Sequence, residues 1–428
     1  MTVSAEEFLR RHDMYYEQMP FGELVERYCE EMRAGLEGRP STLYMLPSFI
    51  RSDAEPRRGE SVLVLDAGGT NLRAGRMHFD RQGRPVTEAL KKRHMPGTFG
   101  EEISADEMFR QIAAFALEYS EGCSGACISF SYPCRSLPDG DGEILELCKE
   151  LQVSGAEGRA VCASLEQTLT EMGASGRRRW RLVNDSVGSL LGGMAAFRED
   201  AADYIGFILG TGANSCCRLP SAWITKSPEA VAMGGEMIVN MESGCFGRLL
   251  QGTADRELDA ASDLPGDHPA EKMISGSYYR QLLQLTLELA AREGLLTMDP
   301  PGDTAGCWIT APAVDRFCLD PHGDNLLARA MRTRSDRSFA AAVNDALLER
   351  AARVAAAGLC AVIRLRSLPR GSRVLVCADG SMIRLSPVLR PKMEKYFDEY
   401  ALAGLGVKAE FRFAQDATLL GCAWAGLI

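Results

Sequence analysis

The stretch Leu65-Asp66-Ala67-Gly68-Gly69-Thr70-Asn71-Leu72-Arg73 decides the fold, because it joins two predicted strands through a glycine turn. The residues before the turn, SVLVLD (61–66), form an apolar run that predicts a buried strand. After it, NLRAGRMHF (71–79) alternates as an antiparallel partner strand would. Glycines at a strand end let backbone N–H groups approach phosphate oxygens. The pattern therefore predicts a phosphate loop, with a plain glycine hairpin as the alternative for this segment taken alone.

Side chains of this turn add chemistry to the backbone. Thr70 and Asn71 supply short hydrogen-bond donors beside the glycines. An acidic residue at the end of a strand can hold a hydrated Mg²⁺ ion, whose charge offsets that of a polyphosphate. Asp66 is the candidate for that role.

Two further strand ends carry glycine turns. Gly210-Thr211-Gly212-Ala213-Asn214-Ser215 follows the buried run YIGFIL (204–209) and can cradle phosphate in the same way. Ala378-Asp379-Gly380-Ser381 follows SRVLVC (372–377), and its small residues would admit a base or ribose. Taken alone, the third segment is explained by a simple turn. It supports a nucleotide site only in combination with the other two glycine turns.

The chain of 428 residues exceeds what one hydrophobic core usually serves, which predicts two domains. An amphipathic helix is predicted at 21–38, and strands are predicted at 125–133 and 180–185 in addition to those above. Helical periodicity between the strands predicts the helices 106–120, 164–173, 278–294 and 346–366. Strands that alternate with helices indicate an α/β architecture.

Composition excludes several classes of function. The formal charge of -10 opposes binding to nucleic acid, and no apolar run approaches the ~18 residues of a membrane span. The N-terminal residues lack the apolar region of a secretion signal, so a cytoplasmic location is predicted. The 14 cysteines include no CxxC pair and form no ligand cluster with the histidines along the sequence. We therefore expect reduced thiols and no structural zinc site.

Taken in order, the motifs of this chain resemble those of the hexokinase family, within the larger actin-like ATPase class of folds. The resemblance covers nearly the whole chain. It rests on MLPSFI (45–50), LDAGGTNLR (65–73), SFSYPC (129–134), LVNDSVGSL (182–190), ILGTGANS (208–215), NMESGCFG (240–247), DRELDAASDLPGDHPAEKMISGSYY (255–279) and VCADGSMIR (376–384).

This resemblance implies a two-domain actin-like ATPase (ribonuclease H-like) α/β fold with an interdomain cleft. The smaller α/β domain is expected to comprise 55–184 plus 415–428, and the larger one 1–54 plus 185–414. The implied activity is ATP-dependent phosphorylation of a glucose-like hexose at O6, which yields hexose 6-phosphate and ADP. It further implies ATP and Mg²⁺ as cofactors, a hexose as the partner, and a monomer or homodimer.

Individual residues match the family's motifs. Asp185 matches the catalytic base, and Lys149 matches the lysine that reaches the sugar and the transferred phosphoryl group. The implied sugar ligands are Ser131, Cys148, Lys149, Asn184, Asp185, Asn214, Glu242 and Glu271. The implied nucleotide ligands are Asp66, Gly68, Gly69, Thr70, Asn71, Arg73, Gly210, Thr211, Gly212, Gly380 and Ser381.

The chemistry suits these residue types. A sugar hydroxyl is a poor nucleophile near neutral pH, so a carboxylate that accepts its proton during phosphoryl transfer is useful. Amides and carboxylates together can hold several hydroxyls of one polyol. Outside the family context, Asp185 is also explained as a residue that caps the following helix.

Two positions depart from the family. Cys148 stands where a threonine usually precedes the lysine, and a thiol is a weaker hydrogen-bond partner than a hydroxyl. Ser243 replaces a bulky aromatic residue, which affects local packing and the size of sugar accepted. Other functions stay open at this point: a kinase of the same fold for an amino sugar or polyol, or a non-catalytic sugar sensor.

Overall fold

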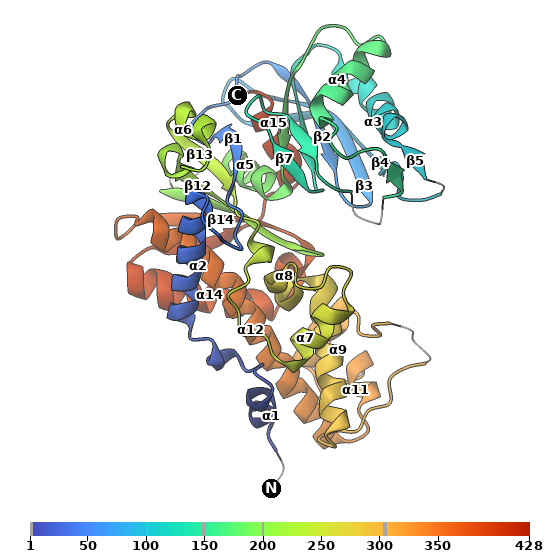
Figure 1. Ribbon diagram of the computed structural model, residues 1–428, viewed down its shortest axis with the longest axis vertical. Helices are drawn as coiled ribbons and strands as arrows, with labels where there is room; N and C mark the ends of the chain where they lie inside the picture. Colours follow the sequence, from blue (N-terminus) through green and yellow to red (C-terminus); the bar gives the residue numbers. More distant parts are fainter. Residues whose placement is uncertain (1–2, 101, 148–150, 199–200, 303–305) are drawn as a thin grey trace.

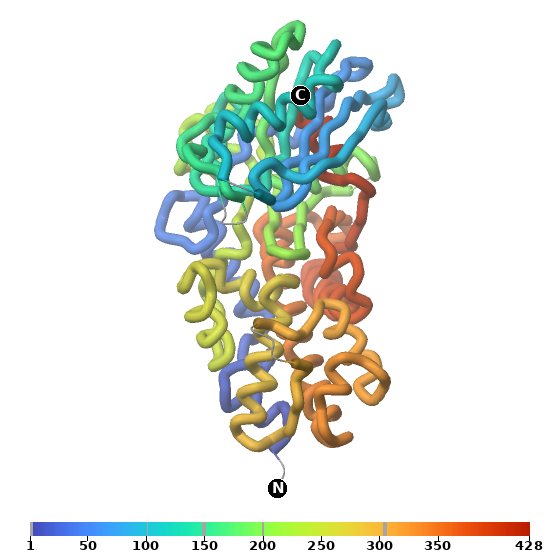
Figure 2. The backbone as a smooth tube through the Cα atoms, turned by 90° about the vertical axis from the view of Figure 1, so that its right-hand side faces the viewer, coloured from blue at the N-terminus to red at the C-terminus, as the bar shows by residue number. Residues whose placement is uncertain are grey.

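The computed structural model describes residues 3–100, 102–147, 151–198, 201–302 and 306–428. The molecule is elongated, with an upper lobe and a longer lower lobe, and the N-terminus lies at the far lower end (Figure 1). Seen from the side, the C-terminal residues lie in the upper lobe among segments from the first half of the chain (Figure 2). The chain therefore returns to its first lobe at its end.

The smaller of the two principal sheets forms around the first glycine turn. Its strands, in spatial order, are β10 (Arg179–Val183), β6 (Cys123–Phe130), β2 (Ser61–Ala67), β3 (Asn71–Phe79) and β4 (Pro85–His94). The apolar run of β2 is buried because it is the central strand. Two short ribbons flank this sheet: β5 (Ile103–Ser104) with β9 (Val153–Ser154), and β7 (Cys134–Ser136) with β8 (Gly142–Ile144).

The larger sheet forms around the second glycine turn. Its strands are β1 (Leu46–Arg51), β13 (Glu236–Asn240), β12 (Ala213–Pro220), β11 (Asp203–Leu209), β14 (Arg373–Asp379) and β15 (Lys408–Arg412). From β13 to β15 this sheet repeats the order and strand directions of β4, β3, β2, β6 and β10. In both sheets the glycine turn joins the central strand to its antiparallel neighbour, so the two turns occupy equivalent places.

Helices cover the sheets and extend the lower lobe (Figure 1). In the upper lobe, α3 (Ala105–Ser120) and α4 (Val161–Glu171) pack against each other and contact the smaller sheet. Two apolar helices, α5 (Asp185–Phe197) and α15 (Ala417–Ala425), pack closely together and contact strands of both sheets between them. Their side chains join those of both sheets in one buried cluster, so this helix pair connects the lobes.

The lower lobe is mainly helical. Its longest helix is α12 (Arg334–Arg366), which begins with a capping box between Thr333 and Asp336. The other helices of the chain are α1 (Ala5–Arg11), α2 (Phe21–Glu37), α6 (Pro228–Met233), α7 (Thr253–Ala261), α8 (Pro269–Ile274), α9 (Gly276–Arg292), α10 (Ala311–Leu319), α11 (Leu326–Ala330), α13 (Ser381–Leu385) and α14 (Leu389–Tyr396). Short 3₁₀ turns lie at η1 (Tyr16–Gln18), η2 (Ser221–Trp223) and η3 (Ser243–Cys245), and α14 continues into a π-helical segment, η4 (Phe397–Leu405).

The strands and helices predicted from periodicity are present, with two notable differences. The helix predicted at 346–366 begins twelve residues earlier, at Arg334, because its polar first turns hide the apolar period. The basic run 177–181 predicts a solvated loop before the strand, but Arg178 is buried and its Nε donates to Glu166 at 2.9 Å. Among the described residues, no helix is both long enough and apolar enough to cross a bilayer.

Candidate active site

The first glycine turn borders a cavity at the end of the smaller sheet. Its Gly68 N–H donates to the Asn71 carbonyl at 2.9 Å, and the Tyr132 hydroxyl donates to the carbonyls of Gly68 and Gly69 at 3.1 and 3.3 Å. Asn71 also donates from its side chain to the Thr70 hydroxyl at 2.9 Å. The cavity measures about 580 Å³ and is lined by Asp66, Gly68, Gly69, Thr70, Asn71, Arg73, Leu90, Lys91, Lys92 and Asp416.

Arg73 holds two carboxylates at this cavity. Its Nε donates to Asp66 at 2.9 Å, and its Nη1 donates to Asp416 at 2.7 Å, 343 residues along the chain. Burial raises the pKa of Asp66, and the charge of Arg73 opposes that rise. The guanidinium is therefore shared between the predicted metal ligand and the start of α15.

Sequence reasoning missed the basic strand beside Arg73. In the register of β3 and β4, Lys92 lies opposite Arg73 and Leu90 lies opposite Gly75, so both share the face of Arg73. Lys91 points to the other face, where it pairs with Glu118 of α3 at 3.0 Å. The stretch 85–94 shows no alternation of apolar and polar residues, so it carries no strand signal in the sequence, and only the pairing with β3 brings Lys92 to the cavity.

The second and third glycine turns are in contact. The N–H of Gly276 donates to the Gly210 carbonyl at 2.7 Å, and a methyl group on Gly210 would lie 3.2 Å from the Cα of Gly380. Gly380 has a φ of 108°, which favours glycine, and Ser381 then opens α13. Thr211 is exposed at the tip of the second turn. The predicted second phosphate loop and adenosine turn thus lie side by side.

A chain of amide side chains links Asn184, which follows β10 of the smaller sheet, to predicted sugar ligands of the larger sheet. Asn214 donates from Nδ2 to Asn184 at 3.3 Å and to Asn240 at 3.0 Å. Asn240, which sequence reasoning did not single out, donates in turn to Glu242 Oε1 at 2.7 Å. Glu271 Oε2 accepts the backbone N–H of Ala213 at 2.8 Å. Burial raises the pKa of both Glu242 and Glu271.

Asp185 begins helix α5, directly after the N-cap residue Asn184. Its Oδ1 accepts the Ser186 N–H at 2.7 Å, but the residue that caps the helix is Asn184, whose side chain accepts the same N–H at 2.9 Å, so the capping alternative falls to Asn184 and not to Asp185. Burial and the charges of Glu242, Asp66 and Asp379 together raise the pKa of Asp185 to about 7, although the hydrogen bond from the Ser186 N–H lowers it. Those three carboxylates belong to the sugar network, the first loop and the third turn, so Asp185 lies within the field of all three.

The remaining predicted ligands are placed as follows. Ser131 is exposed just after β6, and its N–H donates to the Ala67 carbonyl at 3.1 Å, beside the first loop. Cys148 and Lys149 lie outside the described residues. Ser243, in place of a bulky aromatic residue, donates to the Ser215 hydroxyl at 3.0 Å, so the polar network fills that position.

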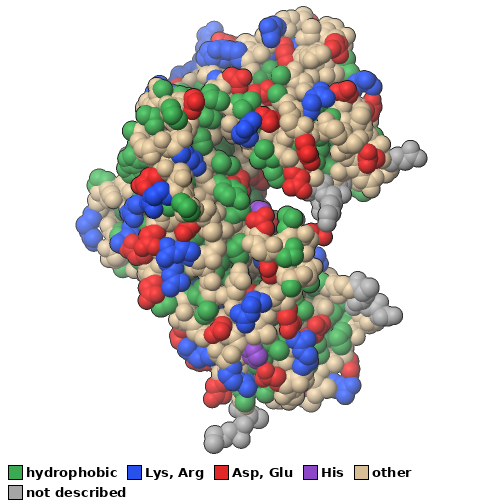
Figure 3. Space-filling view, viewed as in Figure 1, with side chains coloured by type: hydrophobic (Ala, Val, Ile, Leu, Met, Phe, Trp, Pro, Cys, Tyr) green, Lys and Arg blue, Asp and Glu red, His purple; other side chains and the backbone are tan. Residues whose placement is uncertain are grey.

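Those predicted sugar and nucleotide ligands that the structure describes lie beside a hollow on the surface of the protein. The space-filling view shows a hollow between the two lobes, with acidic side chains along its edge (Figure 3). Glycine turns, amides and half-buried carboxylates beside both sheets thus belong to one arrangement suited to a polyol and a phosphate chain.

Comparison with known proteins decides the family. Two hexokinase family models match the chain, one over residues 4–195 and the other over residues 204–428. The chain belongs to the hexokinase family. Hexokinase-3 of Homo sapiens is 30% identical over 383 residues, which cover 83% of this chain and 40% of the human protein. Hexokinase-1 of Schizosaccharomyces pombe is 27% identical and covers 94% of this chain and 86% of the yeast protein.

The solved hexokinase structures confirm the fold class. The hexokinase from Schistosoma mansoni complexed with glucose superposes with a TM-score of 0.76 at 22% identity, covering 99% of this chain and 97% of that one. The predicted actin-like α/β fold is therefore confirmed. This chain spans about two fifths of the length of the mammalian hexokinases that it matches, at 40% of the human protein.

Proposed function

We propose that the protein transfers the terminal phosphoryl group of ATP to O6 of a hexose, giving hexose 6-phosphate and ADP. The observation that carries the proposal is Asp185, a carboxylate with a pKa of about 7. It lies in the electric field of Glu242 from the sugar network, Asp66 from the first glycine turn and Asp379 from the third. A general base works best when its pKa lies near the operating pH, because it is then ionised and still basic. Family membership supports the same reaction.

In this mechanism Asp185 accepts the proton of the sugar hydroxyl as its oxygen bonds to phosphorus. Asn184, Asn214, Glu242 and Glu271 hold the other hydroxyls, so that the acceptor hydroxyl faces the phosphate chain. A site built from paired amides and carboxylates rejects acceptors that leave those groups without hydrogen bonds. The network from Asn184 to Glu242 supports this role because its members already orient one another.

The nucleotide would lie along the glycine turns. Backbone groups of the first loop, with Arg73 and Lys92, would offset the charge of the phosphates in the 580 Å³ cavity. Asp66 and Asp416 offer the hard oxygen donors that Mg²⁺ prefers, usually through water. Mg²⁺ bound with the triphosphate would neutralise charge that develops during transfer. Lys149, outside the described residues, is proposed to reach the transferred group.

The proposed domains are 55–184 plus 415–428 and 1–54 plus 185–414. Of the proposed sugar ligands, Asn214 lies on the larger sheet, whereas the first phosphate loop lies on the smaller one. We infer that hexose binding closes the hollow between the lobes. Small-angle scattering should then report compaction on addition of hexose, and unchanged curves would contradict closure. We retain a cytoplasmic monomer or homodimer as a prediction.

The deciding experiment incubates purified protein with Mg-ATP and, separately, glucose, other hexoses, amino sugars and polyols, and measures the sugar phosphate directly. A hexose 6-phosphate as the main product supports the proposal. A preference for amino sugars or polyols would favour the alternative kinase. Tight sugar binding with no phosphorylated product from any acceptor would favour the sensor instead.

A further inference from the structure

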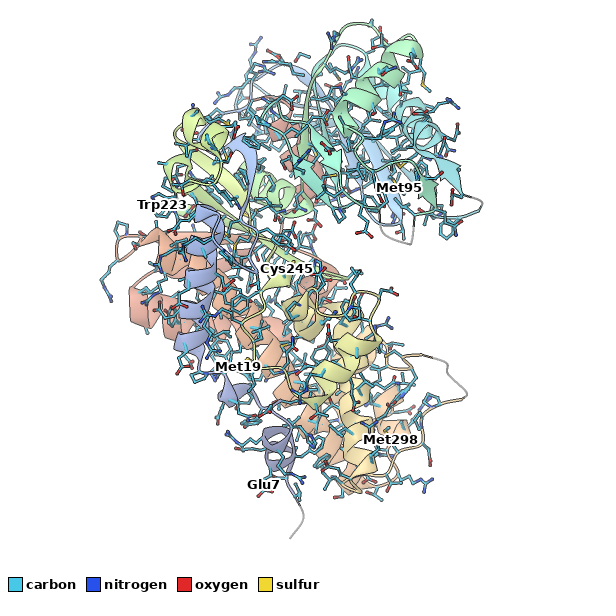
Figure 4. The ribbon with its side chains drawn as sticks, viewed as in Figure 1. Glu7, Met19, Met95, Trp223, Cys245 and Met298 are labelled. Carbon is cyan, nitrogen blue, oxygen red and sulfur yellow. The ribbon has the colours of Figure 1, made fainter. Side chains whose placement is uncertain are left out.

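A cysteine, an aspartate and a histidine meet beside the sugar carboxylates. One ligand atom each from Cys245, Asp267 and His268 lies within 4.8 Å of the others. Cys245 ends the η3 turn, whereas Asp267 and His268 directly precede α8. Because Cys245 is more than twenty residues from Asp267, the sequence showed no sign of this group, and no such cluster was predicted. Figure 4 labels Cys245 where the lower lobe faces the hollow.

The geometry is close to that of a metal site. Around a tetrahedral ion with bonds of about 2.0–2.3 Å, neighbouring ligand atoms are roughly 3.3–3.8 Å apart. His268 Nδ1 and an Asp267 oxygen already lie 3.0 Å apart, so the three donors need to move by only about 1 Å to surround an ion. A thiolate, an imidazole and a carboxylate are the donors that Zn²⁺ prefers, whereas Mg²⁺ prefers oxygen alone.

The backbone on both sides of this cluster is fixed. The Cys245 N–H donates to the Glu242 carbonyl at 3.0 Å, and the Lys272 N–H donates to the His268 carbonyl at 3.0 Å. The His268 N–H itself donates to the other oxygen of Asp267, at 2.9 Å. The ligand positions are therefore held by the same turns that carry Glu242 and Glu271.

The surrounding charge favours a cation. Asp267, Glu242 and Glu271 all act electrostatically on the Cys245 thiol, which is only 5% exposed. The nearby ammonium of Lys272 is bound elsewhere, to Asp259 at 2.5 Å and to the Leu264 carbonyl at 2.7 Å. A divalent cation here would offset carboxylates that Lys272 does not contact.

We propose that Cys245, Asp267 and His268 form a site for a thiophilic divalent cation of the Zn²⁺ class, and that its occupancy weakens sugar binding. On coordination the Cys245 thiol loses its proton to solvent. Three protein ligands leave a fourth position open, and a bound cation would attract the carboxylates of Glu242 and Glu271 away from sugar hydroxyls. This effect on sugar binding rests on the proposed function, whereas the metal site does not.

The test is a titration of the purified protein with Co²⁺, which reports thiolate ligation by a charge-transfer absorption band. We expect one equivalent to produce the band and one equivalent of Zn²⁺ to remove it. Cys245→Ser should lose the band, and His268→Gln should weaken Co²⁺ binding at least 10-fold, in line with the loss of one ligand. A wild-type protein without the band, or Cys245→Ser with an unchanged one, overturns the site.

Cys318→Ser is the matched control. The Cys318 sulfur also lies near a carboxylate, 3.6 Å from Asp345, but it belongs to no such three-ligand group among the described residues. This variant should keep the band and its stoichiometry. If Cys318→Ser removes the band instead, the Co²⁺ is bound there and the proposed site is wrong.

Sugar binding tests the second half of the proposal. Calorimetry with glucose should show at least 10-fold weaker binding in the presence of Zn²⁺ for the wild type, and no Zn²⁺ effect for Cys245→Ser. An unchanged glucose affinity at full Zn²⁺ occupancy overturns the coupling. If no sugar phosphate is made in the earlier assay but the Co²⁺ band is present, the kinase proposal fails while the metal site stands.

Discussion

The two principal sheets share one backbone plan but carry different chemistry. Asp66 lies on the central strand β2, opposite Arg73 of β3, whereas the equivalent position on β11 is Ile208, opposite Asn214 of β12. In the larger sheet the acid is on the neighbouring strand, where Asp379 of β14 lies beside Ile208. The same strand order thus places a charged pair beside the first glycine turn and an uncharged pair beside the second.

The covering of the two loops differs as well. The first loop borders the 580 Å³ cavity with Arg73 and Lys92. The second is closely covered, since methyl groups on Gly210 and Gly212 would lie 3.2 Å from Gly380 and 2.8 Å from Glu271. Repetition of a backbone therefore fixes where loops lie, and side chains decide what each loop binds.

The largest expected effect concerns the stability of each lobe. Glu166 pairs with Arg178 in the upper lobe, and Asp255 pairs with Arg350 in the lower lobe, with all four side chains largely buried. Because each substitution leaves a buried arginine unpaired, Glu166→Ala and Asp255→Ala should each cost about 3–5 kcal/mol in unfolding free energy. If the lobes are separate domains, urea unfolding should show two transitions, and each variant should lower the midpoint of a different one.

Two exposed pairs provide controls for that comparison. Glu118→Ala and Glu257→Ala remove surface partners of Lys91 and Arg292, and neither should move a transition appreciably. One cooperative transition, shifted equally by both buried variants, would contradict the predicted division into domains.

The next effect concerns Asp185, between the two lobes. Asp185→Ala should lower kcat by about 10²-fold or more, because the sugar hydroxyl loses its proton acceptor. The variant should still fold, as circular dichroism can verify. Asp299→Ala, which removes an exposed partner of Arg332, is the control and should leave kcat unchanged. Near-normal turnover in Asp185→Ala would remove this residue from the mechanism.

A smaller effect separates the two glycine-lined regions. A methyl group on Gly380 would lie 2.4 Å from the Leu209 backbone, whereas one on Gly68 meets nothing closer than 3.6 Å. Gly380→Ala should therefore cost roughly 1–3 kcal/mol through overpacking. Gly68→Ala should leave the melting temperature almost unchanged. Equal melting temperatures for the two variants would show that the second loop is not tightly covered.

The last effect is the pH dependence of the unfolding free energy. The pKa of Asp185 rises from 3.8 to about 7 on folding, so its folded carboxyl keeps a proton that the unfolded chain releases. Its stabilising contribution is complete below pH 3.8 and is lost as pH rises through about 7, by up to about 1.4 kcal/mol per pH unit. Asp185→Asn should abolish this slope in unfolding experiments from pH 4 to 7.

Activity should have the opposite pH dependence. The base must be ionised, so kcat/KM of the wild type should increase as pH rises through about 7. A flat profile from pH 5 to 8 would show that another group accepts the proton.

Local patterns in the sequence determined much of this protein. The apolar run before Gly68 and the alternation after it specify a strand, a turn and a strand, because burial and side-chain direction follow a period of two residues. The residues around Asp185 likewise marked the start of a helix, whereas the resemblance to the family made Asp185 the candidate base. Resemblance to the family supplied the remaining roles, and the roles of all these residues stay predictions.

Tertiary structure alone decided the contacts between distant segments. Arg73 meets Asp416 across 343 residues, Lys92 reaches the cavity only through the register of β3 and β4, and Cys245 meets His268 only after the turns fold together. Sequence periodicity states which face of an element is buried, but not which other element covers it. That choice depends on the packing of the whole chain, since each such contact forms only when both segments are already held in place.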